Sequence, residues 1–330
     1  MKIENRNWIT DKPNNRIMEQ YIKVKILSVN VSKKTGTVKK PVEFIRVTDE
    51  GIKGDAHAGD WHRQISVLAQ ESVDRFSKKA GRGIGYGEFA ENITTEGLEL
   101  KDCSVFDRFE SPDIVLEVTQ IGKKCHGDDC AIYRETGNCV MPKEGIFCRV
   151  VKKGVVKPGD TLKYVPKVFR ILVITLSDRA SRGEYKDRSG PEIVKIAKEF
   201  FKNINKDCQV LPLVIPDNEK QLRNIMETSI KDEVDFIITT GGTGIGAKDI
   251  TVETVKPLLD KEIPGIMEMI RMKYGQEKPN ALISRGVAGV AGKSLVFTLP
   301  GSVNAVREYM EEITKVAEHL IYMLHEIDVH

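Results

Sequence analysis

The sequence lacks a hydrophobic run long enough to cross a membrane. A membrane-spanning helix needs about 20 consecutive apolar residues, and no stretch of the 330 residues approaches that length. The first residues, 1–6, also lack the apolar core of a secretory signal peptide. These absences argue against a membrane protein, and we expect a cytoplasmic one.

Strong net charge and a dense cysteine pattern are also missing. The net charge of +3 is too small to indicate a nucleic-acid partner. Six cysteines in a chain of this size favour reduced thiols or metal ligands over a disulfide framework. There is no internal repeat and no low-complexity segment. The length favours two domains, at roughly 150 residues each.

The first half of the chain carries a strand pattern. Residues 1–20 are polar and aperiodic, and we expect them to form a flexible tail. Short alternating segments separated by turns then predict a mainly-β, barrel-like domain over 21–163. The expected strands are 24–29, 42–47, 65–68, 114–121 and 146–151, with one helix at 71–80. Residues 164–167 are the expected linker.

The second half, 168–330, alternates strands with helices. Strands are expected at 169–175, 210–214, 236–239 and 295–299, and helices at 191–200, 219–231, 252–259, 265–274 and 302–324. This alternation predicts a doubly wound α/β domain with a mostly parallel sheet. In such sheets, ligands bind beyond the carboxyl ends of the strands.

A glycine-rich loop follows one of these strands. Its sequence, Thr-Thr-Gly-Gly-Thr-Gly-Ile-Gly-Ala-Lys-Asp at 239–249, lacks the Gly-Lys-Ser/Thr of a P-loop and the dinucleotide Gly-x-Gly-x-x-Gly pattern. Glycines still allow backbone amides to approach a ligand closely, and a helix start beside them favours an anion. The alternative is a tight turn with no ligand. Asp249, at the loop's end, could hold a metal bound to phosphates.

Other polar loops follow the predicted strands. Asp178 and Asp217 come after strand ends, and Asp187 precedes a helix. Singly, such residues most often cap helices or stabilise turns. Because the carboxyl ends of parallel strands share one edge, we expect several of these loops to converge there.

Residues 168–330 resemble the MogA/MoaB family of molybdenum cofactor biosynthesis proteins, also called the gephyrin G-domain family. The matching segments are Asp-Arg-Ser-Gly-Pro at 187–191, the glycine loop at 239–249, Pro264-Gly265 with Glu268, Ser284-Arg285, and Leu-Pro-Gly-Ser with Asn304 at 299–304. The resemblance implies a three-layer α/β fold, usually trimeric, that binds molybdopterin. In the adenylyltransferase branch, ATP and Mg²⁺ convert molybdopterin to its adenylylated form.

From this resemblance we assign Asp217 and Asp249 to catalysis and to Mg²⁺, a cation that prefers oxygen ligands. Glu268 is a weaker third acid, with an ordinary surface position as its alternative. Some family members are not clearly catalytic, so a molybdopterin carrier or scaffold is the rival function. The positions expected to bind the cofactor are Gly241, Gly242, Thr243, Gly244, Glu268, Ser284, Arg285, Ser302 and Asn304.

The first half contains a cysteine-rich stretch that begins Lys-Lys-Cys-His at 123–126. Positive neighbours favour the reactive thiolate of Cys125. This stretch, with 51–55, 87–98, 145–147 and 157–160, resembles a MOSC domain, the sulfur-carrier domain related to molybdenum cofactor sulfurases. The resemblance covers about 21–163 and implies a mainly-β fold that handles pterin cofactor or sulfur. Cys125 matches the position expected to carry a persulfide or to contact the cofactor.

Two alternatives remain for the cysteines. Cys125, Cys130 and Cys139 with His126 or His57 could bind tetrahedral zinc, or they could be ordinary buried thiols. We expect Cys103, Cys148 and Cys208 to be structural. His57 and His62 lie in a polar cluster, 54–63, and either stabilise a turn or face a ligand. The expected partners are further copies of the chain in a homotrimer, a cysteine desulfurase and molybdenum-insertion proteins.

Overall fold

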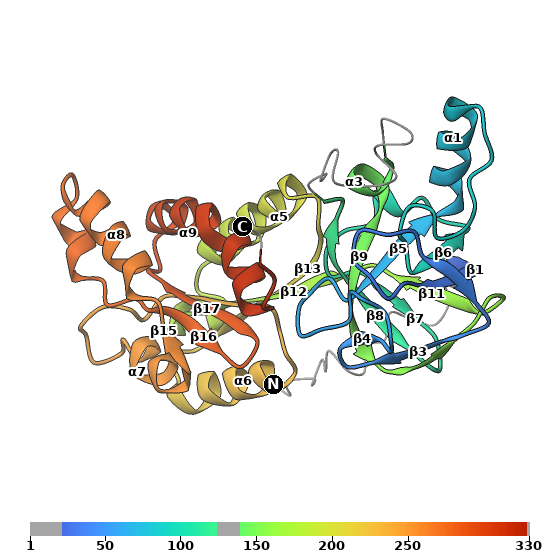
Figure 1. Cartoon of the computed structure of the whole chain (residues 1–330). Helices are drawn as coiled ribbons and strands as arrows, with labels where there is room; N and C mark the ends of the chain where they lie inside the picture. Colours follow the sequence, from blue (N-terminus) through green and yellow to red (C-terminus); the bar gives the residue numbers. More distant parts are fainter. Residues whose placement is uncertain (1–21, 124–138, 329–330) are drawn as a thin grey trace. The chain divides into compact units, whose positions relative to one another are not determined.

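The computed structural model describes residues 22–123 and 139–328. The chain forms two compact units that divide between Pro166 and Lys167 (Figure 1). The expected tail at 1–20 and the residues Cys125, His126 and Cys130 lie outside the described ranges.

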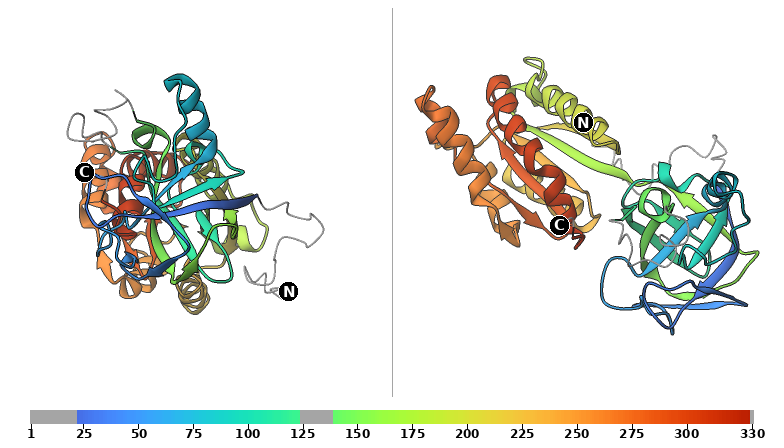
Figure 2. Two further views of the ribbon diagram at one scale, coloured as in Figure 1. Left: turned by 45° about the vertical axis from the view of Figure 1, so that its right-hand side comes forward. Right: turned by 45° about the horizontal axis from the view of Figure 1, so that its top comes forward.

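The first unit is built on a closed barrel. Its strands are β1 (Lys23–Val31), β2 (Lys40–Val42), β3 (Ile45–Thr48), β4 (Gly51–Ile52), β5 (Ile65–Ala69), β6 (Ile93–Glu96), β7 (Arg108–Glu110), β8 (Val115–Ile121), β9 (Ile146–Lys152), β10 (Gly154–Val156) and β11 (Thr161–Val165). The barrel order is β11-β7-β8-β9-β5-β6-β1, and β1 pairs with β11 to close it. Figure 2 shows the strands of this unit from two further directions. Strand β2 extends the sheet from β1, and β10, β3 and β4 form a small separate sheet.

Alternation along the strands builds the barrel core. In β1, Val24 and Ile26 are fully buried while Lys23 and Lys25 are exposed, as a one-sided strand requires. Among its described residues, the helices of this unit are α1 (Gln70–Ala80), η1 (Leu100–Asp102) and α3 (Met141–Glu144).

The single strand predicted at 42–47 is wrong, because β2 and β3 divide this segment between two sheets. Strand β2 pairs with β1, whereas β3 pairs with β10 and β4. The alternation of apolar residues continues across the change of sheet, so the pattern does not reveal it. Strands β6 and β7 were not predicted, because each has only a few residues.

The second unit has a mixed six-stranded sheet in the order β13-β12-β14-β17-β16-β15. Its strands are β12 (Val168–Leu176), β13 (Asp207–Ile215), β14 (Phe236–Thr240), β15 (Lys261–Glu262), β16 (Ala288–Ala291) and β17 (Ser294–Leu299). The first four strands in the order pair in parallel, and β16 and β15 are antiparallel. The sheet is therefore mixed, with three parallel and two antiparallel pairings, where a mostly parallel sheet was expected. The glycine and alanine of β16 give a weak strand signal, and this segment resembled a loop.

Helices cover both faces of this sheet (Figure 1). They are α4 (Asp178–Ser181), α5 (Ser189–Asn203), α6 (Glu219–Lys231), α7 (Thr251–Val255), η3 (Lys256–Leu258), α8 (Pro264–Gly275), η4 (Pro279–Ile283) and α9 (Val303–Leu324). Buried residues of α6 and α7 share one core cluster with the sheet, and α5 packs against α9 on the opposite face. No helix of the described ranges is long and apolar enough to cross a membrane.

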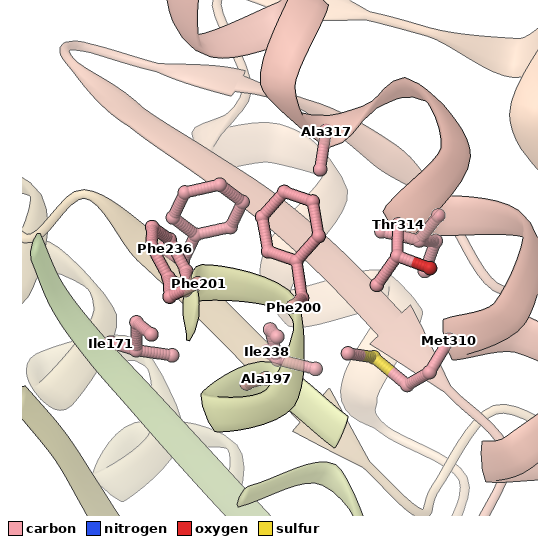
Figure 3. Close-up of a pocket in the computed structure, with 10 residues that line it drawn as sticks. Ile171, Ala197, Phe200, Phe201, Phe236, Ile238, Met310, Thr314 and Ala317 are labelled. Atoms are coloured by element: carbon pink, nitrogen blue, oxygen red, sulfur yellow. The ribbon is translucent and has the colours of Figure 1, made fainter. Parts of the chain in front are cut away.

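The face beneath α5 and α9 is aromatic. The Phe201 ring lies edge-on to Phe236 with ring centroids 5.5 Å apart, and Phe236 stacks on Phe297. A small apolar pocket between the two helices has a volume of about 10 Å³ and is lined by residues such as Ala197 and Met310 (Figure 3). Because that is about the space of one water molecule, the pocket is a packing defect and not a ligand site.

The strand register brings four loops to one edge of the sheet. Leu176 at the end of β12 pairs with Ile215 at the end of β13, and Thr175 pairs with Thr240 at the end of β14. Thr240 in turn pairs with Leu299 at the end of β17. The loops that follow these strands therefore start side by side.

Candidate functional site

The glycine loop begins with two residues that must be glycine. Gly241 has a φ of +100°, and a Cβ there would lie 2.4 Å from the Leu176 carbonyl oxygen. Gly242 has a φ of +65°, and its Cβ would lie 2.4 Å from Thr251 Oγ1. Side chains are therefore excluded by backbone conformation and by space together.

Hydrogen bonds fix this turn to its neighbours. The Gly241 amide donates to the Leu299 carbonyl at 2.9 Å, across to the end of β17. The Thr251 hydroxyl donates to the Gly241 carbonyl at 2.8 Å, and the Thr251 amide donates to the Gly242 carbonyl at 3.1 Å. Thr243 is buried. The loop is thus held rigidly before any ligand arrives.

Asp249 folds back over the loop that precedes it. Its Oδ2 accepts the Gly246 amide at 2.8 Å, and its own amide donates to the Gly246 carbonyl at 3.0 Å. The same oxygen lies 2.8 Å from the position that a Cβ on Gly244 would occupy. The carboxylate therefore sits directly against the backbone of the glycine loop.

Asp217 pairs with a second acid, Asp178, for which the sequence alone predicts a helix cap or a turn. The Asp178 amide donates to Asp217 Oδ2 at 3.0 Å, and the Asp217 amide donates to Asp178 Oδ1 at 3.2 Å. Lys248, beside Asp249, bonds Asp178 Oδ2 at 2.7 Å and lowers the pKa of that carboxyl. Asp178 therefore links the acidic pair to the glycine loop, and its position directly after β12 was the available signal.

Arg285 clamps the loop from the other side. Its amide donates to the Thr243 carbonyl at 3.1 Å, and its Nε donates to the Gly244 carbonyl at 2.8 Å. Its guanidinium pairs with Glu253, and this pairing raises the pKa of Arg285. This side chain, expected to bind the cofactor, is thus already engaged by a carboxylate.

The remaining predicted residues lie on helix starts and surfaces. Ser302 Oγ accepts the Ala305 amide at 3.2 Å and caps α9. Asn304 and Glu268 are exposed, on α9 and α8. Asp187, which precedes the N-cap residue of α5, accepts the amides of Ser189 and Gly190, in keeping with the turn or capping role expected of it singly.

The acids at this edge suit a cation only together with phosphate ligands. Asp217 and Asp249 each use Oδ2 on a backbone amide, and within the described residues no donor bonds to Oδ1 of either. No group of three or more His, Cys, Asp or Glu side chains in 22–123 and 139–328 could hold a metal ion. Mg²⁺ is commonly held by one or two carboxylates plus substrate phosphates and water, and Asp217 and Asp249 would offer it oxygens of this kind.

The first unit has a buried ionic cluster in the segment predicted to be polar. Lys39 Nζ lies 2.6 Å from Asp55 Oδ2, and both side chains are almost completely buried. His57 Nδ1 lies 3.3 Å from Lys39 Nζ and 3.4 Å from Asp55 Oδ1. Burial opposes ionisation of Asp55, but hydrogen bonds from His57 and Lys39 outweigh it and hold its pKa well below the usual range.

A second buried acid lies in the 87–98 segment. Glu91 accepts the Gly87 amide at 2.6 Å and the Phe89 amide at 3.1 Å. Burial raises the pKa of this carboxyl, while the amide bonds oppose the rise. The adjacent Ala90 has a φ of +61°, a conformation that a residue with a Cβ rarely adopts. The Lys39 amide donates to the Gly87 carbonyl at 2.9 Å. The segment around Glu91 is therefore a neighbour of the ionic cluster of Lys39, Asp55 and His57.

The described cysteines of the first unit differ in burial: Cys103 and Cys148 are buried, whereas Cys139 is only partly buried. Burial raises the pKa of the Cys103 thiol to about 12 and that of Cys148 well above its ordinary value, as expected for inert structural thiols. Since Cys125 and Cys130 lie outside the described residues, the persulfide and zinc hypotheses stay predictions.

Comparison with known proteins agrees with both resemblances. Residues 172–319 match the family model described as "Probable molybdopterin binding domain", and residues 54–163 match the model described as "MOSC domain". The MOSC match begins at residue 54, whereas the predicted domain begins at residue 21.

Related proteins and solved structures match the second unit. A molybdopterin adenylyltransferase of Pyrococcus furiosus is 37% identical over 164 residues, which are 48% of this chain and 93% of the relative. The molybdenum cofactor biosynthesis protein B of Staphylococcus carnosus is 38% identical over 160 residues, 47% of this chain and 88% of the relative. The solved structure of the tungsten cofactor synthesizing protein MoaB from P. furiosus is 35% identical and covers 48% of this chain and 99% of its own, with a TM-score of 0.42. The chain therefore belongs, through its second unit, to the molybdopterin-binding family of molybdenum cofactor biosynthesis proteins, and its first unit contains a MOSC domain.

Proposed function

We propose that the second unit is a molybdopterin adenylyltransferase. An oxygen of the terminal phosphate of molybdopterin attacks the α-phosphorus of ATP. A new P–O–P bond forms, the bond between the α-phosphorus and the bridging oxygen breaks, and pyrophosphate leaves. Two anionic substrates must be held in line for this reaction, so positioning and charge neutralisation supply most of the catalysis.

The described residues offer groups for each task. Backbone amides of the glycine loop from Gly242 to Gly244 would hold phosphate oxygens. The Gly241 amide, also expected there, already donates to the Leu299 carbonyl. Asp217 and Asp249 would hold Mg²⁺, which neutralises phosphate charge when bound. Asp178, bonded to Asp217 and Lys248, would keep the two acidic loops in register. Thr243, Ser284, Ser302 and Asn304 would orient the pterin substrate, together with the exposed Glu268 of α8.

One observation carries this proposal: the four parallel strands end together, and their loops are tied to each other by hydrogen bonds. The Asp178–Asp217 pair joins the loops after β12 and β13. Lys248 joins the first of these to the glycine loop. The names of the relatives support adenylyl transfer as the reaction at this edge.

The decisive test is turnover by Asp249→Asn with molybdopterin, ATP and Mg²⁺. We expect molybdopterin binding to remain and adenylylated product to fall by at least about 100-fold, as for loss of a major electrostatic group. Asp207→Asn, an exposed acid at the amino end of β13, is the matched control and should keep full activity. Turnover by Asp249→Asn at the wild-type rate would refute the role of Asp249. Tight binding by the wild type without any product would favour the rival carrier function.

For the first unit we propose a sulfur-handling role centred on Cys125. The support is the Lys-Lys-Cys-His sequence and the MOSC match. After incubation with a cysteine desulfurase and cysteine, Cys125 should carry one extra sulfur atom as a persulfide. Mass spectrometry should detect this as a gain of about 32 Da. Cys125→Ser should prevent the gain, whereas Cys208→Ser should not. Bound zinc that disappears with Cys130→Ser would favour the metal alternative.

We further propose a cytoplasmic homotrimer that assembles through the second unit, with molybdenum-insertion proteins as partners. Apolar side chains exposed on α8 and η4 support a surface between copies: Met272 is 68% exposed and Ile283 is 59% exposed. Light scattering should give three times the 37.0 kDa chain mass. Met272→Glu should lower that mass, and Met323→Glu, at an exposed methionine on α9, should not.

A further inference from the structure

Two hydroxyls between α9 and the Ser284–Arg285 segment have no hydrogen-bond partner among the described residues. Tyr309 is only 2% exposed, and its Oη atom is buried and unpaired. Ser284 Oγ is likewise buried and unpaired. The two groups are close enough for Ser284 to lower the pKa of Tyr309, yet no hydrogen bond of normal geometry joins them.

An unpaired hydroxyl in a protein interior is unfavourable, because it has lost its bonds to water and gained none. Buried polar groups in folded proteins therefore nearly always have a partner, whether protein, water or ligand. A phenylalanine would fill almost the same volume as Tyr309 without this cost. The tyrosine hydroxyl thus indicates a partner that the chain itself does not supply.

The surroundings of Tyr309 define which partner would fit. Arg271, from α8, donates through Nη1 to the carbonyls of Ser284 and Gly286 at 3.3 and 3.4 Å, which are long for such bonds. Burial raises the pKa of Tyr309, and Ser284 and Arg271 both oppose the rise. Two hydroxyls and a guanidinium form a donor-rich group, and such a group fits an acceptor oxygen.

This group also lies next to the loop clamp. Arg285, the neighbour of Ser284, bonds the carbonyls of Thr243 and Gly244. A ligand atom that reaches Ser284 Oγ therefore lies beside the residue next to Arg285, which holds the glycine loop by its hydrogen bonds.

We propose that Tyr309, with Ser284 and Arg271, forms a subsite that accepts an oxygen of the pterin substrate. The proposal rests on the proposed function, since it takes molybdopterin as the ligand of this edge. Tyr309 contacts the ligand through its hydroxyl, so the subsite fixes the position of the pterin and not of the nucleotide.

The test is Tyr309→Phe in the full chain, with Tyr322→Phe as the matched control. Tyr322 is on the same helix, and its hydroxyl already bonds Glu318. Thermal unfolding and calorimetric binding of molybdopterin and of ATP are measured for each variant. We expect Tyr309→Phe to unfold at the same temperature as the wild type or higher, because an unpaired hydroxyl is removed. Its Kd for molybdopterin should rise about 3- to 10-fold, the loss of one hydrogen bond, with the Kd for ATP unchanged.

Three results would overturn the proposal. An unchanged Kd for molybdopterin would show that the hydroxyl has no ligand role, and a lower unfolding temperature with unchanged binding would indicate a structural water. A weaker Kd for ATP alone would place the nucleotide there instead. If the wild type binds molybdopterin but forms no product, the proposed reaction fails while the subsite is still judged by Kd. Ser284→Ala provides a second variant, and its effect on Kd should not add fully to that of Tyr309→Phe.

Discussion

Replacing Gly241 with alanine tests the conformation on which the site is built. The added methyl would meet two penalties. At a φ of +100°, an alanine costs about 1–2 kcal/mol relative to glycine. The Cβ would also lie 2.4 Å from the Leu176 carbonyl oxygen, and relieving such an overlap typically costs a further 1–3 kcal/mol or so. We therefore expect Gly241→Ala to destabilise the second unit by roughly 2–5 kcal/mol.

Gly292→Ala separates the two penalties. Gly292 also has a positive φ, +56°, but the nearest atom to its Cβ position is 3.4 Å away, an ordinary contact. This variant should lose only the conformational part, about 1–2 kcal/mol. Both glycines belong to the second unit, so the same measurement serves both.

Hydrogen exchange followed by mass spectrometry is the appropriate assay, because the chain has no tryptophan after Trp61 to report on the second unit. Protection of peptides from β14 and β17 should fall by at least about 30-fold in Gly241→Ala, since each 1.4 kcal/mol is a factor of ten. Peptides from the barrel serve as the internal reference. Equal losses of protection in the two variants would show that the contact with Leu176 adds no cost. No loss of protection in either variant would show that the positive φ adds none.

Three further predictions concern the first unit. Lys39→Met should destabilise it by about 3–5 kcal/mol, because the buried Asp55 carboxylate loses its partner. Urea unfolding followed by tryptophan fluorescence measures this change. The control Lys153→Met, at an exposed ion pair, should change stability by less than about 1 kcal/mol. Since the pKa of Asp55 is lower in the folded state than its unfolded value of about 3.9, its contribution to stability is present above that pH and is lost as the pH falls below it; an Asp55→Asn variant should lack this acid dependence. The thiols of Cys103 and Cys148 should resist iodoacetamide at pH 8 in the folded protein, and mass spectrometry showing their modification before unfolding would contradict their burial.

The sequence by itself determined the two units and most elements of the second. Alternation placed some of the barrel strands, such as β1, in which Val24 and Ile26 are buried. Local signals are sufficient for this, because a strand or helix shows its buried face within its own residues. The same holds for the glycine loop, whose residue types are dictated by its own backbone.

Only the tertiary structure decided which residues meet. Asp178 and Asp217 are far apart in the chain, and their reciprocal bonds depend on the parallel register of β12 and β13. The antiparallel β16 has no strong pattern of its own and is a strand because β17 pairs with it. The unpaired hydroxyl of Tyr309 is equally invisible in the sequence, where a tyrosine on a helix is an ordinary core residue. Which partners a polar group has is a property of the packed fold, because those partners come from other elements.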